Sequence, residues 1–134
     1  MAGMLYLVPT PIGNLGDISL RCRETLESAD FIAAEDTRVT LKLLNHLGIK
    51  KSLVSYYEHN KAAQGSRIVE RILSGETCAL VSDAGSPAIS DPGEDLVKQC
   101  AAAGIPVCAI PGPCAAITAL SISGQATGRF CFEG

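Results

Sequence analysis

The sequence contains no tryptophan, and aromatic residues make up only 4% of its 134 residues. Small aliphatic residues supply most of its 47% hydrophobic content, which favours a layered α/β domain over a β-sandwich. Charged residues of both signs reach 19%, and this mixture is not typical of a disordered chain. A chain of this length can bury one hydrophobic core. The composition therefore predicts one folded α/β domain.

Long apolar runs are also missing. No stretch reaches the length that a membrane-spanning helix needs, so we expect no membrane partner. The start does not resemble a signal peptide, because Arg21 and Arg23 come after the first apolar stretch rather than before it. We therefore expect a cytoplasmic protein.

The pattern of a metal site is absent as well. The six cysteines are not arranged as C-x-x-C, and His46 and His59 do not have the spacing of metal ligands. Most of the cysteines fall within apolar helix or strand patterns, as small core residues do. We expect structural thiols, no metal and no disulfide framework, since disulfides are rare in the cytoplasm.

A strong positive charge is missing too. The net charge of −3 argues against a free-standing nucleic-acid binder. Residues 1–71 nevertheless hold nine of the eleven Lys and Arg residues, against eight Asp and Glu. A polyanion would meet this half first, although solvated helix faces explain the same pattern. A polyanion would be met around Arg21, Arg23, Arg38, Lys42, Lys50, Lys51 and Lys61.

Short apolar runs alternate with helical patterns along the chain. Five such runs are too continuous for strands with one wet face, and we expect them to be buried strands at 4–8, 31–34, 53–56, 78–81 and 105–110. Strands that alternate with helices through short connections form parallel sheets. The sequence predicts a three-layer α/β domain, with a mostly parallel five-stranded sheet and helices on both faces.

The helix boundaries carry their own signals. We expect Asp36 or Thr37 to cap one helix and Gly48 to end it in a left-handed conformation. Asp91 is the expected N-cap of a later helix, with Pro92 at its first position. The last helix, from Ala115, is apolar on all sides, so we expect it to be buried.

Every candidate functional loop follows a strand. The carboxyl ends of parallel strands meet at one edge of a sheet, where open α/β sheets bind their ligands. We therefore expect these loops to gather there and the bent, proline-rich 83–90 segment to hold a small-molecule cofactor. The loops are 9–17, 35–38, 57–61, 83–90 and 111–115.

Common catalytic motifs do not occur in these loops. The chain has no phosphate-binding G-x-x-x-x-G-K-[ST] and no G-x-S-x-G nucleophile elbow. Gly13 and Gly16 form only part of a dinucleotide fingerprint. An aspartyl acceptor at Asp83 is conceivable, but the bent loop after it suits backbone contacts with a ligand. The residues alone predict a binding edge and no particular reaction.

Four segments together resemble the tetrapyrrole-methylase superfamily. They are LYLVPTPIGNLGD at 5–17, AEDTR at 34–38, VSDAGSPAISDPG at 81–93 and IPGPCA at 110–115. Within the superfamily they are similar to the bacterial 16S rRNA cytidine-2′-O-methyltransferases. The resemblance covers the chain in order, and the four motifs in combination are specific.

The resemblance implies the N-terminal domain of a class III methyltransferase that uses S-adenosyl-L-methionine (SAM). The implied acceptor is the ribose 2′-hydroxyl of a cytidine in 16S rRNA, within the small ribosomal subunit, and the implied assembly is a homodimer. Gly85-Ser86-Pro87 stands where the superfamily has Gly-Asp-Pro, so Asp83 is expected to replace the missing carboxylate. The implied cofactor-binding residues are Ile12, Asp83, Gly85, Ser86, Pro87, Ile89, Cys114 and Ala115.

The proton acceptor stays open among four side chains at the expected edge. A ribose hydroxyl is a weak nucleophile, so a positioned base would help it react. The candidates are Glu35, Asp36, Glu58 and His59, while Arg38 and Lys61 are expected to contact RNA phosphates.

The resemblance also implies a second domain. We expect residues 1–124 to form the N-terminal SAM-methyltransferase subdomain and residues 125–134 to start the linker to a missing C-terminal domain. We expect little methyl transfer from these residues alone. Two alternatives remain: a sibling SAM methyltransferase acting on a tetrapyrrole or a protein side chain, and a non-catalytic module for ligand binding or dimerisation.

Overall fold

The computed structural model describes residues 3–134 and contains a parallel five-stranded sheet in the order β3-β2-β4-β1-β5. This confirms the predicted fold class. The strands are β1 (Leu5–Leu7), β2 (Phe31–Ala34), β3 (Leu53–Ser55), β4 (Cys78–Val81) and β5 (Val107–Ala109). The helices are α1 (Leu20–Ser28), α2 (Thr37–Leu47), α3 (Lys61–Leu73), α4 (Gly93–Ala102) and α5 (Ala115–Ser121), with a short 3-10 turn, η1, at Leu15–Asp17.

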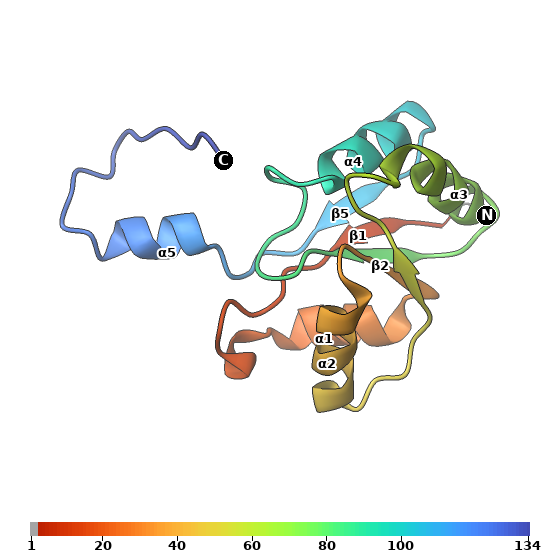
Figure 1. Cartoon of the computed structure of the whole chain (residues 1–134), viewed down its shortest axis with the longest axis horizontal. Helices are drawn as coiled ribbons and strands as arrows, with labels where there is room; N and C mark the ends of the chain where they lie inside the picture. The colour runs from red at the N-terminus through yellow and green to blue at the C-terminus, as the bar shows by residue number, and fades with distance from the viewer. Residues whose placement is uncertain (1–2) are drawn as a thin grey trace.

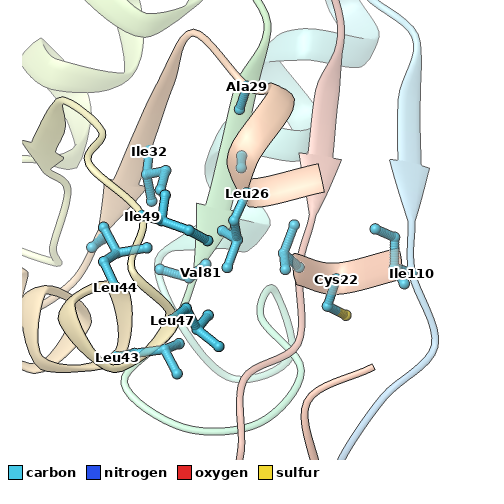
Figure 2. Packing of buried hydrophobic residues seen from close by; sticks show 13 residues of the cluster. Cys22, Leu26, Ala29, Ile32, Leu43, Leu44, Leu47, Ile49, Val81 and Ile110 are labelled. Carbon is cyan, nitrogen blue, oxygen red and sulfur yellow. The ribbon is translucent and has the colours of Figure 1, made fainter. Parts of the chain in front are cut away.

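Two helices cover each face of the sheet (Figure 1). Side chains alternate along a strand, and β4 therefore sends Ala79 and Val81 into one apolar cluster and Cys78 and Leu80 into the other. The first cluster packs under α1 and α2, where Figure 2 shows Leu26 and Leu44 among its members. The second packs under α3 and α4. All four β4 residues are buried, as a central parallel strand requires.

Capping side chains set the helix ends. Asp36 caps α2 by accepting a hydrogen bond from the Arg38 N–H at 3.0 Å, and Gly48 ends that helix at φ +70°. The expected start of α4 was one residue early, because Pro92 is the N-cap and the helix begins at Gly93. The Asp91 carboxylate still accepts the Gly93 N–H, at 2.8 Å.

Helix α5 extends away from the sheet, and the residues after it turn back toward the loop between β4 and α4 (Figure 1). None of the α5 residues is buried, so the prediction of a buried last helix was wrong for the described chain. The apolar pattern was read correctly, but α5 leaves the sheet after residue 114 and meets neither cluster. Ile117 of this helix is 52% exposed, Leu120 is half-buried, and Ile122, just beyond the helix, is 85% exposed.

The cysteines are free thiols. Cys22, Cys78 and Cys100 are buried in the core, Cys108 and Cys114 are half-buried, and Cys131 is exposed. Within residues 3–134, no group of three or more His, Cys, Asp and Glu side chains could hold a metal ion. Over the same residues, no helix has the length and apolar character needed to cross a membrane.

Candidate functional site

The loops after β1, β4 and β5 meet at the carboxyl end of the sheet, as predicted. Thr10 and Gly85 exchange two backbone hydrogen bonds, with N–O distances of 3.1 and 3.0 Å. The Ser86 hydroxyl donates to the Pro113 carbonyl oxygen at 3.1 Å. These contacts join segments far apart in the sequence into one surface.

The loops after β2 and β3 attach to the same surface. The Asp36 N–H donates to Asp83 Oδ1 at 3.1 Å. The buried Tyr56 hydroxyl donates to the Pro92 carbonyl oxygen at 2.9 Å. Burial raises the pKa of Tyr56 to about 12, so its hydroxyl stays protonated and remains a donor. The segment after β4 is thus held by neighbours on both sides.

This segment, residues 82–92, turns sharply. Gly85 has φ +79°, and Ala88 and Ser90 also have positive φ values, of +71° and +53°. Left-handed backbone costs a residue with a side chain about 1–2 kcal/mol. The Asp91 carboxylate offsets part of this cost by accepting the Ala88 N–H at 2.9 Å. The loop is a fixed, strained bend, of the kind that is often found at binding sites.

A pocket of about 490 Å³ opens beside Gly85, and we call it the Gly85 pocket. Its volume lies within the range typical of small-molecule sites, and its lining is mostly apolar. Six of the eight predicted cofactor-binding residues line it: Ile12, Gly85, Ser86, Ile89, Cys114 and Ala115. The other lining residues are Ala84, Ala116, Ile117, Phe130 and Phe132.

The remaining two predicted residues lie elsewhere. Pro87 is buried and lines a separate apolar groove beside α4 and β5, which Ser86 and Ile89 also line. Asp83 lines a second pocket, of about 320 Å³, between the first loop and α2, which we call the Thr10 pocket. The structure therefore brings six of the residues together and separates Asp83 from them.

Thr10 carries an unusual buried group. It is 3% exposed, and its hydroxyl Oγ1 is buried without a hydrogen-bond partner. Leaving a buried hydroxyl unpaired costs about 1–3 kcal/mol. The residue lines the second pocket, where a bound molecule could supply the missing bond.

The acidic candidates differ in their surroundings. Glu35 is half-buried, and its pKa is raised by burial first and then by the nearby carboxylates of Asp83 and Asp91. The pKa of Asp36 is lowered by hydrogen bonds from the Arg38 side chain and backbone. Of these two, Glu35 is therefore the better suited to hold a proton.

The other candidates lie along the β3 side. Lys61 Nζ lies 2.9 Å from Glu58 Oε1 and within ion-pair distance of Asp95 at 2.6 Å, so two carboxylates hold it. His59 is exposed, and its ring lies 6.2 Å from the Tyr57 ring in an edge-on arrangement. Arg38 pairs with Asp36 at 3.1 Å, yet its side chain is 88% exposed.

Sequence reasoning missed several lining residues. Phe130 and Phe132 reach the Gly85 pocket from the tail, which no periodicity links to the sheet. Thr10 lies in the candidate loop 9–17 but was not among the predicted site residues. One signal could have found it: a threonine between two prolines, just past the end of a buried strand, has little freedom to reach solvent.

This chain is similar in sequence to proteins of known name. "Ribosomal RNA small subunit methyltransferase I" of Haemophilus influenzae is 54% identical over all of this chain, which covers 47% of that protein. The protein of the same name from Halalkalibacterium halodurans is 58% identical over 98% of this chain and 46% of its own length. The chain thus spans about half the length of these relatives, whose identity confirms the resemblance inferred from the motifs.

Solved structures give the same fold. Uroporphyrin-III-C-methyltransferase from Thermus thermophilus is 25% identical, with a TM-score of 0.69 over 94% of this chain and 55% of its own. A diphthine synthase is 18% identical, with a TM-score of 0.74 over 92% of this chain and 50% of its own, which supports the fold alone. The family model of Tetrapyrrole (Corrin/Porphyrin) Methylases matches residues 4–130. The chain belongs to that family.

Proposed function

We propose that the chain forms the SAM-binding half of a methyltransferase that methylates the 2′-hydroxyl of a cytidine ribose in 16S rRNA. The observation that carries the proposal is the Gly85 pocket, built by loops from three strand ends, in a chain 54% identical to a ribosomal RNA small subunit methyltransferase. The substrate would be the small ribosomal subunit, and this would place the protein in the cytoplasm.

The residues of the Gly85 pocket fit such a cofactor. SAM, when bound, supplies a methyl group on a sulfonium. Apolar side chains such as Ile12, Ile89 and Ala115 suit the faces of an adenine ring. Ser86 stands where a carboxylate is usual in the family, and its hydroxyl is already used by Pro113.

The chain's contribution to the reaction would be alignment. Methyl transfer is an in-line displacement, and fixed geometry lowers its barrier by several kcal/mol. The hydrogen bonds between Thr10 and Gly85 and between Ser86 and Pro113 hold the pocket walls in place. Burial raises the pKa of Glu35, which suits a proton acceptor, but Glu35 lines neither the Gly85 pocket nor the Thr10 pocket.

We also propose the two-part organisation expected from the sequence. Residues 1–124 would act as one methyltransferase subdomain, and residues 125–134 would start a linker to another. The greater length of the relatives supports this. We further propose a homodimer, because the exposed apolar side chains of α5 and the tail, such as Ile117 and Phe130, would be covered by a second copy.

A chimera tests the function directly. Residues 1–134 would replace the matching half of the Haemophilus influenzae relative, with that relative as positive control. We expect the chimera to methylate small subunits lacking the modification and to bind S-adenosylhomocysteine. A folded chimera that binds this ligand but leaves the subunits unmethylated would contradict the acceptor assignment. Size measurement by light scattering on the same preparation tests the homodimer.

One observation favours a tetrapyrrole as an alternative methyl acceptor. A uroporphyrin-III-C-methyltransferase shares the fold at 25% identity. The same chimera should therefore be offered a reduced uroporphyrin. Methylation of the tetrapyrrole without methylation of the subunit would favour this alternative.

A further inference from the structure

The Thr10 pocket is a further cavity at the carboxyl end of the sheet, and the cofactor assignment leaves it unused. It is lined by Thr10, Pro11, Gly13, Asn14, Leu15, Val39, Thr40, Lys42, Leu43, Ser82 and Asp83. Its volume, about 320 Å³, lies at the lower end of the range for small-molecule sites. It is large enough for one flat, nucleoside-sized group.

The two pockets are neighbours through shared loops. In the first loop, Thr10 lines one pocket and Ile12 lines the other. In the loop after β4, Asp83 lines one pocket and Ala84 the other. The paired backbone bonds between Thr10 and Gly85 tie these two loops together. Loops that contribute to both linings thus place the two cavities side by side, as two molecules that must react with each other require.

The lining of the Thr10 pocket combines apolar walls with a few polar groups. Leu15, Val39 and Leu43 offer apolar walls, as the face of a base requires. Polar contacts come from the place where the first loop and the loop after β4 meet. There Thr10 has its unpaired buried hydroxyl, and Asp83 has one carboxylate oxygen held by the Asp36 N–H.

Charge points to the same kind of ligand. Lys42 is an exposed cation on α2 that lines the pocket, and no hydrogen bond or ion pair is recorded for its side chain within residues 3–134. A lysine at the side of such a pocket suits the phosphate of a nucleotide. By contrast, the Gly85 pocket has no cationic lining residue among those residues.

We propose that the Thr10 pocket binds the acceptor nucleotide, taken out of its RNA stack, with its ribose hydroxyl beside Thr10 and Asp83. This inference rests on the proposed function, because it places the acceptor of that reaction. The base lies against Leu15, Val39 and Leu43, and Lys42 meets a phosphate. Asp83 thereby contacts the acceptor, which differs from the cofactor contact expected from the motif. Enzymes that modify a nucleotide commonly extrude it in this way.

Nuclear magnetic resonance on the chain itself gives the first test. Cytidine 5′-monophosphate should shift amide signals of residues 13–15 and 39–43. S-adenosylhomocysteine, titrated separately, should shift those of 84–89 and 114–117. The inference is overturned if millimolar cytidine 5′-monophosphate leaves residues 13–15 and 39–43 unmoved, or if it competes with S-adenosylhomocysteine. Failure of S-adenosylhomocysteine to bind counts against the proposed function instead.

A pair of variants of the chimera gives the second test. Val39→Phe fills the pocket from an exposed position on α2, and Leu41→Phe adds a ring to the same helix at an exposed position that does not line it. We expect Val39→Phe to raise the KM for small subunits roughly tenfold, with the KM for SAM unchanged, and Leu41→Phe to change neither. Equal behaviour of the two variants in an active chimera overturns the inference while the proposed function stands.

Discussion

The Ser86 hydroxyl and the Pro113 carbonyl oxygen lie 3.1 Å apart and join the loops after β4 and β5. These loops form opposite walls of the Gly85 pocket, which Ser86 and Cys114 both line. The Ser86 side chain therefore helps to hold the shape of the pocket in addition to lining it.

Ser86→Ala should loosen the pocket. Losing one hydrogen bond at an exposed site costs about 0.5–1.5 kcal/mol, which corresponds to a roughly two- to tenfold weaker affinity for S-adenosylhomocysteine. Calorimetric titration measures this loss. Ser66→Ala removes a comparable hydroxyl bond on α3, away from the pocket, and should leave the affinity unchanged. Equal affinities for the two variants would remove Ser86 from the cofactor contacts.

Gly85→Ala should destabilise the protein and narrow the pocket. The residue has φ +79°, and an added Cβ would lie 3.3 Å from both Ile12 Cγ2 and the Pro113 oxygen. The backbone alone accounts for a loss of about 1–2 kcal/mol in the free energy of unfolding. Gly104→Ala is a matched control, with φ +72° and open space around its Cβ. Denaturant unfolding should show the larger loss for Gly85→Ala.

Tyr56→Phe should lower the free energy of unfolding by about 1–3 kcal/mol, because the buried Pro92 carbonyl loses its donor. The bond anchors the residue before α4, so amide exchange in residues 88–95 should also accelerate. Tyr57→Phe removes a hydroxyl from a side chain that is 40% exposed, and it should change stability little. Unchanged exchange in Tyr56→Phe would show that the anchor is unnecessary.

Stability should depend on pH through Glu35. Its pKa is raised above the ordinary 4.5, so the folded state favours the protonated side chain. The stability that this proton provides is complete below pH 4.5 and is lost as pH rises through the raised pKa. Glu35→Gln should therefore be more stable than the parent at neutral pH, and the difference should vanish below pH 4.5. Asp95→Asn is an opposite control, because Lys61 lowers the pKa of Asp95. It should be less stable than the parent at neutral pH.

RNA affinity should depend more on Arg38 than on Lys61. The Arg38 side chain is 88% exposed, whereas Lys61 is held by Glu58 and Asp95 and would have to leave them. In the chimera, Arg38→Gln should weaken binding to small subunits and reduce the salt slope by about one. Lys61→Gln should change the slope less. An unchanged slope for Arg38→Gln would remove this residue from the phosphate contacts.

The parts of the fold that could be predicted are those that short-range patterns determine. Continuous apolar runs identified β4 as a buried strand, and Gly48 and Asp36 marked helix ends through local hydrogen bonding. The meeting of Gly85 with Ile12 and Cys114 followed from parallel topology. Helix α5 was predicted, but its exposure was not, because an apolar surface does not reveal what covers it.

The division between the two pockets could not be predicted either. Asp83 and Gly85 are two residues apart, and only the bend between them sends one toward α2 and the other toward α5. Resemblance of motifs places both in one loop and cannot separate them. Phe130 and Phe132 reach the site through the course of the tail, which leaves no periodic signal in the sequence.

The strand order has a consequence for how the protein forms. Strand β4 lies between β2 and β1, so neither of these earlier strands can pair with the other while the chain is being synthesised. Both strands stay without this partner until residues 78–81 have been synthesised, and their unpaired edges can meanwhile bind other nascent chains. Ribosome-bound intermediates shorter than this should need chaperone protection, and the central insertion should set the pace of folding.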